Sequence, residues 1–165
     1  MAERSSVLRY CDIDHEEIAA LLAHFQLEIW VSEIDEDIPG SYWGDEEAGL
    51  IGKRLYLRSD TPLHSILHES CHYICMDNAR REKLHTDAKS DIDEENAVCY
   101  LQILLAEKLS LINRDQLFED MDSWGYSFRL GSAKAWFKQD ADEARNWLLR
   151  FKLIDEQLRP QFRLR

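Results

Sequence analysis

The chain has 165 residues, of which 45% are hydrophobic, and a formal net charge of −12 at pH 7. This length supports one domain with a real core, and the hydrophobic content argues against disorder. A strongly negative surface repels nucleic acid and anionic membranes, so we expect neither as a partner. Residues 1–12 contain no signal-peptide core, and no run approaches the roughly 20 apolar residues of a membrane span. We therefore expect a soluble, cytoplasmic protein.

The first part of the chain is expected to contain a helix and two strands. A helix capped by Asp14 is predicted to run to about Phe25, because its apolar residues recur on one face. Residues 27–31 are typical of a strand, and residues 35–47 are typical of a long loop. Residues 53–58 alternate between apolar and polar side chains, which predicts a half-buried strand.

The segment that follows contains the motif that indicates a chemistry most directly. Residues 68–72 read H-E-S-C-H, an H-E-x-x-H motif, within a predicted helix that begins with the Thr-Pro pair at 61–62 as N-cap and first residue. Positions four apart lie on one face of a helix, so His68 and His72 can bind one zinc ion. Glu69 then faces the metal-bound water as a general base. The motif favours a zinc-dependent hydrolase over two surface histidines on an amphipathic helix.

A catalytic zinc site normally takes three protein ligands, so a third ligand is required. The metzincin continuation of the motif is excluded, because Cys75 and Asn78 occupy its Gly and His positions. The remaining option is a carboxylate at the start of the next predicted helix, residues 91–105. Glu94 shares a face with the most apolar stripe of that helix, where a carboxylate is costly unless it is paired or metal-bound. We therefore prefer Glu94, and Glu95 stays open because the unknown crossing angle of the two helices shifts the phase.

The two motifs together, H-E-S-C-H and then E-E-N-A-V-C at residues 94–99, resemble the gluzincin zinc peptidases. The similarity is greatest to the small intracellular group typified by the ImmA/IrrE peptidases, and it covers about residues 48–106. The resemblance implies that His68, His72 and Glu94 are the ligands of one zinc ion per chain. It also implies that Glu69 is the general base.

The sequence departs from the family pattern at two positions. Glu95 replaces a small residue, and Gln102 stands where an aliphatic residue is usual, which keeps Glu95 open as the third ligand. The resemblance implies an α+β, zincin-like fold with a small mixed or antiparallel sheet packed on the H-E-x-x-H helix and a second ligand helix. A helical C-terminal part completes the expected fold.

The expected substrate is a peptide or protein. If the strand at residues 53–58 forms a sheet edge beside the metal, an extended peptide can pair with it through main-chain hydrogen bonds. A further donor is needed to stabilise the oxyanion that forms on the substrate. The possible oxyanion or cleft residues are His64, His85, Tyr100 and Tyr126.

Two or three more helices are predicted after residue 111. One spans residues 113–123 and ends at Gly125, and another begins at Asp140 with Glu143 completing a capping box. We expect a single domain with a catalytic core at about 1–111 and a helical cover at about 112–165 that has no chemistry of its own. The alternatives are a non-catalytic metal-binding or partner-binding protein on the same scaffold, and a hydrolase of another amide.

Overall fold

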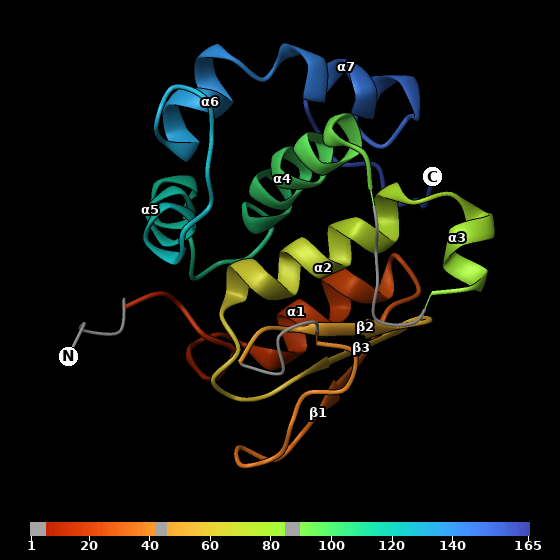
Figure 1. Cartoon of the computed structure of the whole chain (residues 1–165), viewed down its shortest axis with the longest axis vertical. Helices are drawn as coiled ribbons and strands as arrows, with labels where there is room; N and C mark the ends of the chain where they lie inside the picture. The colour runs from red at the N-terminus through yellow and green to blue at the C-terminus, as the bar shows by residue number, and fades with distance from the viewer. Residues whose placement is uncertain (1–5, 42–45, 85–89) are drawn as a thin grey trace.

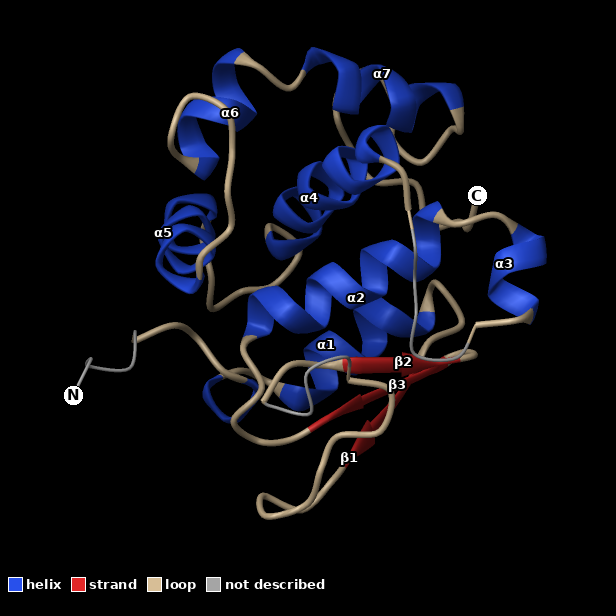
Figure 2. Cartoon of the chain, in the orientation of Figure 1, coloured by secondary structure: helices blue, strands red, loops and turns tan. Residues whose placement is uncertain are grey.

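A computed structural model describes residues 6–41, 46–84 and 90–165, which form an α+β fold (Figures 1 and 2). The sheet, α2, α4 and α7 follow one another from the bottom to the top of Figure 1. None of the helices in these residues combines the length and apolar character that crossing a membrane requires. The elements are the 3-10 helix η1 (Tyr10–Asp12), α1 (His15–Ala23), β1 (Glu28–Val31), β2 (Gly49–Ile51), β3 (Arg54–Leu57), α2 (Leu63–Cys75), α3 (Asn78–Glu82), α4 (Ile92–Ala106), α5 (Arg114–Trp124), α6 (Ala133–Gln139) and α7 (Asp142–Arg150).

The sheet is small and mixed, with the strand order β1-β3-β2. β3 pairs parallel with β1 and antiparallel with β2. The turn between β2 and β3 contains Gly52 at φ +56°, a left-handed conformation that glycine adopts without strain. Leu55 and Leu57 of β3 are buried while Arg54 is exposed, so the predicted alternation is confirmed. Of the two possibilities for this strand, a sheet edge or an ordinary core strand, the structure shows the second, because β3 is central and β1 and β2 are the edges.

Helix α2 carries the H-E-x-x-H motif and is almost entirely buried. Its N-cap is Pro62 rather than Thr61, because the Thr61 hydroxyl instead accepts a hydrogen bond from the backbone N–H of Arg58 at 2.8 Å. The N–H of Leu63 donates to the carbonyl of Leu8 at 2.8 Å. The N-terminal segment therefore satisfies the start of α2 that a capping side chain would otherwise serve.

Helix α4 packs between α2 and α7 and is buried around most of its circumference. The Asp91 side chain caps it by accepting from the backbone N–H of Glu94 at 2.8 Å. The negative charges of its first turn lie at the positive end of the helix dipole. Because α4 contacts helices on both sides, its polar residues Glu94 and Gln102 are buried inside the protein and need partners there.

The C-terminal helices share one hydrophobic core with the rest of the chain, since the cluster of buried apolar residues extends from Tyr10 to Ile154. α5 agrees with its prediction and ends at Gly125, whose φ of +108° is left-handed. α7 begins at Asp142 without a side-chain cap, so the predicted capping box at residues 140–143 is wrong. The Asp140 carboxylate instead accepts two hydrogen bonds from Arg129, each 2.6 Å long.

Candidate metal centre

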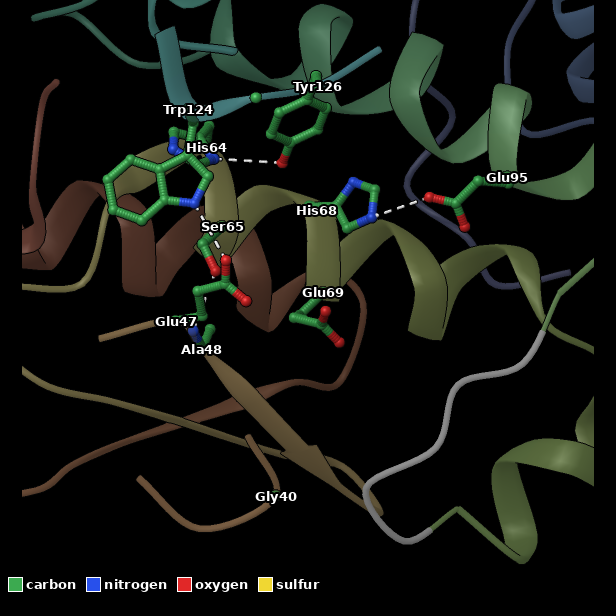
Figure 3. A pocket seen from close by; sticks show the side chains of 11 residues that line it. Gly40, Glu47, Ala48, His64, Ser65, His68, Glu69, Glu95, Trp124 and Tyr126 are labelled. Atoms are coloured by element: carbon green, nitrogen blue, oxygen red, sulfur yellow. Dashed lines mark hydrogen bonds and ion pairs between the residues drawn. The ribbon is translucent and has the colours of Figure 1, made fainter. Parts of the chain in front are cut away.

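Two histidines and one glutamate meet where α2 packs against α4. His68 and His72 lie one turn apart on α2, and their Nε2 atoms are 3.1 Å apart. Glu95, from the first turn of α4, places one carboxylate oxygen 3.1 Å from His68 Nε2 and the other 3.2 Å from His72 Nε2. Figure 3 shows the carboxylate of Glu95 directed at the ring of His68. This group can hold a metal ion.

Glu94 does not join this group, so the expectation that it is the third ligand does not fit the structure. Its side chain is buried, but its carboxylate binds the guanidinium of Arg80, with Nη1 2.9 Å from Oε2. Arg165 also donates to it, at 3.1 Å. A carboxylate on the apolar face does need a partner, as predicted, and the partners of Glu94 are Arg80 and Arg165. Glu95, the alternative, is the carboxylate that faces the histidines.

Gln102 determines how His68 presents its ring. The side chain of Gln102 is fully buried, and its Oε1 lies 2.7 Å from His68 Nδ1. Its amide group also donates to the backbone carbonyl of His64 at 3.2 Å, which fixes the orientation of the amide. A His68 ring that donates from Nδ1 keeps the lone pair of Nε2 for a metal ion. In the sequence, Gln102 is only a departure from the family pattern. In the structure, its side chain is the hydrogen-bond partner of His68.

A cavity of about 400 Å³ opens beside the metal group (Figure 3). Tyr126 enters it from the segment after α5, with its hydroxyl 3.2 Å from Nδ1 of His64. The rings of Tyr126 and His68 meet edge to face, with centroids 5.6 Å apart. The C-terminal part of the chain therefore contributes to the cavity, and Tyr126 is one of the residues that the sequence analysis named as a possible cleft residue. The lining residues are Gly40, Glu47, Ala48, His64, Ser65, His68, Glu69, Glu95, Trp124, Gly125 and Tyr126.

Of the other two possible oxyanion residues, only Tyr100 is described by the structure, and it does not line this cavity. Tyr100 is buried elsewhere, where its ring stacks on Phe137 with centroids 4.4 Å apart. His85 lies outside the residues that the structure describes. His64 and Tyr126 are therefore the two of the four candidates that the structure brings to the metal group.

Burial sets the protonation of the cavity residues. It raises the pKa of Glu69 above the ordinary value, although His72 and His68 act in the opposite direction. Burial also lowers the pKa of His64 to about 3 and raises that of Tyr126 to about 12. Burial would raise the pKa of Glu95 as well, but hydrogen bonds with His68 and His72 hold it well below its ordinary value. At neutral pH His64 is uncharged and Tyr126 keeps its proton.

Two cavity residues, Glu47 and Trp124, were not found by sequence reasoning. Glu47 stands just before β2 and Trp124 is the last residue of α5, and the indole N–H of Trp124 donates to the Glu47 carboxylate at 3.0 Å. They are 77 residues apart in the chain, so no local spacing could have paired them. Only the packing of α5 beside α2 brings them together.

No protein-family model, no curated protein sequence and no solved structure matches this chain. The function must therefore be argued from the chemistry of the cavity. His68 and Glu95 of the metal group line the cavity, together with the carboxylate of Glu69 and the phenol of Tyr126, which keeps its proton at neutral pH.

Proposed function

We propose that this chain is a zinc-dependent metallopeptidase of the gluzincin type, similar to the ImmA/IrrE-like peptidases. The observation that carries the proposal is the spacing of the three ligand atoms. Zinc binds nitrogen and oxygen at about 2.0–2.1 Å in a tetrahedron, which puts neighbouring ligand atoms about 3.3 Å apart. The Nε2 atoms of His68 and His72 are 3.1 Å apart, and the two oxygens of Glu95 lie 3.1 Å from the first and 3.2 Å from the second. One ligand atom from each residue lies within 4.8 Å of the other two, so the three side chains could hold one ion after a small adjustment of the Glu95 carboxylate.

The ligand types favour zinc over other divalent ions. Magnesium and calcium prefer sites made of oxygen atoms, whereas two imidazoles with one carboxylate is a ligand set of catalytic zinc. Three protein ligands would leave room on a bound ion for water or substrate, and two of the three, His68 and Glu95, line the cavity. When bound, zinc supplies Lewis acidity to a carbonyl oxygen and brings the pKa of water toward neutrality.

Glu69 is the general base of the proposed reaction. It follows His68 on α2 and lines the same cavity (Figure 3). Its carboxylate takes a proton from the attacking water and then gives that proton to the nitrogen of the leaving amine. A pKa raised by burial strengthens Glu69 as a base for this transfer. No bond between protein and substrate is required.

Tyr126 is the proposed donor to the oxyanion that forms on the scissile carbonyl. Its phenol stays protonated at neutral pH because burial raises its pKa to about 12. The neutral ring of His64, 3.2 Å away, holds the hydroxyl in position over the cavity. A donor that is already oriented before the reaction lowers the barrier most effectively.

A peptide is the substrate that the surroundings of the cavity support. β2 is an edge strand, and Ala48, the residue before it, lines the cavity. An extended peptide placed over Glu69 would run beside this edge and could pair with it. The strand expected for this role was β3, so the proposal now assigns it to β2.

The test combines a metal measurement with an activity measurement. Purified, untagged protein is analysed for zinc and then incubated with a mixture of short quenched-fluorescent peptides. We expect about one zinc per chain and hydrolysis that a chelator stops and added zinc restores. The Glu69→Gln variant should retain its zinc but lose at least about 100-fold in hydrolysis, as expected when a general base is removed.

Three results would count against the proposal in different ways. Wild-type protein that takes up no zinc, even after zinc is added back, would remove the metal site and the hydrolase together. Protein that holds zinc but shows no hydrolysis that depends on Glu69 would favour the non-catalytic alternative on the same scaffold. Zinc-dependent cleavage of small amides but not of peptides would keep the chemistry and change the substrate.

A further inference from the structure

We propose that Glu47 and Trp124 form a subsite for a positively charged nitrogen of the substrate, next to the bond that is cleaved. This inference rests on the proposed function and adds a substrate class to it. The subsite lies in the same cavity as the metal group. Figure 3 shows Glu47 and Trp124 on one side of Glu69 and Glu95 on the other. A substrate whose carbonyl lies over Glu69 therefore places a flanking group beside Glu47.

The carboxylate of Glu47 is fixed and yet retains an open oxygen. Oε1 accepts a hydrogen bond of 3.0 Å from the indole N–H of Trp124, which is a neutral donor and cancels no charge. Within residues 6–41, 46–84 and 90–165, no hydrogen bond or ion pair is found for Oε2. Glu47 is close enough to raise the pKa of Glu69 by its charge. A fixed carboxylate with a free oxygen inside a cavity is suited to accept from an ammonium or guanidinium group.

The charges of the cavity leave Glu47 without a counterion. Three glutamates line the cavity, and among its described lining residues none is lysine or arginine. A divalent metal ion would balance the formal charges of Glu69 and Glu95. One negative charge then remains, and it is that of Glu47. A cationic substrate group would neutralise it in a partly enclosed space, where charge pairing is stronger than on an open surface.

Arg9, which lies over the Trp124 ring, is paired elsewhere and does not supply this charge. The guanidinium of Arg9 lies 5.8 Å from the centre of the Trp124 ring. It pairs with Glu46 at 3.1 Å and donates to the carbonyl of Asp60 at 2.6 Å. Glu46 and Glu47 are therefore neighbours with different partners. This makes Glu46 a matched control for Glu47.

The test measures binding without turnover. Zinc-loaded Glu69→Gln protein is titrated by calorimetry with short peptides that differ only in lysine or norleucine at one position on either side of a central bond. A second set compares free with acetylated N-termini, so that a side-chain cation and an α-amine are distinguished. We expect one cationic form to bind roughly 10- to 100-fold more tightly than its neutral match, as for a hydrogen bond to a charged group.

The preference should depend on Glu47. Glu47→Gln in the same background should reduce the ratio of cationic to neutral binding to about one, while Glu46→Gln should leave the ratio as it is. The same peptides are then given to wild-type protein to measure kcat/KM. Binding that depends on Glu47 but is accompanied by no hydrolysis supports the subsite and contradicts the peptidase. Hydrolysis with no preference for a cationic group, or no peptide binding at all, overturns the subsite.

Discussion

Glu94 and Glu95 are consecutive residues of one helix, yet they lie in two different electrostatic environments. Glu94 binds two arginines, whose positive charges are permanent. Glu95 faces two imidazoles, each of which is neutral unless a proton or a metal ion is bound. The first environment is complete within the protein. The second can accept a metal ion from outside, so we expect Glu94 to serve stability and Glu95 to serve the proposed function.

The difference follows from what surrounds each side chain. Arg80 belongs to α3, and Arg165 donates a hydrogen bond to the carbonyl of Cys75 at the end of α2, so Glu94 links elements that are distant in sequence. Glu95 is about half exposed, and it opens on the cavity. A buried carboxylate is therefore not by itself a sign of a metal site, whereas a partly open carboxylate that faces two imidazoles is one.

The largest expected difference between the two glutamates is in metal affinity. Glu95→Gln should weaken zinc binding by more than the roughly 100-fold that loss of an outer-shell partner costs, because it removes a ligand itself. Glu94→Gln should bind zinc nearly as well as wild type. A competition titration with a chelating dye measures both. Loss of zinc in Glu94→Gln with retention in Glu95→Gln would reverse the assignment.

The second prediction concerns stability of the metal-free protein. Glu94→Gln should lower the free energy of unfolding by roughly 3 kcal/mol, because two arginines lose their buried partner. Glu95→Gln should change it by less than about 1 kcal/mol, because its side chain is partly exposed and screened by water. Urea unfolding followed by tryptophan fluorescence gives both values. Equal losses would show that the two environments are not separate.

The third prediction concerns Gln102, which acts on the metal group from outside it. Gln102→Leu should weaken zinc binding by about 10- to 100-fold, since the Nδ1 of His68 loses its acceptor. Gln102→Glu keeps an acceptor at this position and should stay close to wild type. If both variants bind zinc like the wild type, His68 does not need the amide to orient its ring.

The sequence predicted the metal helix well because both histidines belong to one turn of a helix. Spacing in the chain then determines spacing in space. It preferred Glu94 to Glu95, because the pairing of Glu94 with Arg165, which lies 71 residues further along the chain, leaves no local signal in the sequence. The sequence predicted the helix that carries the two glutamates, but it did not predict which distant segments line the cavity. Tyr126, Glu47 and Trp124 reach the cavity only through the packing of α5 and the segment before β2.

The position of the sheet edge was missed for a similar reason. Alternation identified β3 as half-buried, but a central strand of a three-stranded sheet can alternate as an edge strand does. The three residues of β2 are too few to give a pattern of their own. The hairpin turn at Gly52 was the available signal, since a glycine between two apolar runs indicates that both are strands.

The smallest expected effect is a difference in thiol reactivity between the cysteine near Glu94 and the cysteine near the Glu95 group. Cys99 lies beside His68, whereas Cys75 is fully buried near Glu94. Burial raises the pKa of the Cys75 thiol, so at pH 8 it remains protonated and should not react with iodoacetamide. Removing zinc loosens only the His68 environment, so Cys99 should react slowly in metal-free protein and be protected when zinc is bound.

Peptide mapping by mass spectrometry measures the modification at each cysteine. Cys11 is exposed and serves as the internal reference that reacts in either state. If metal removal exposed Cys75 as readily as Cys99, the pairing of Glu94 with its arginines would depend on the metal. Glu94 and Glu95 would then share a single environment, in which the ion pairs of Glu94 with Arg80 and Arg165 form only after the metal has bound.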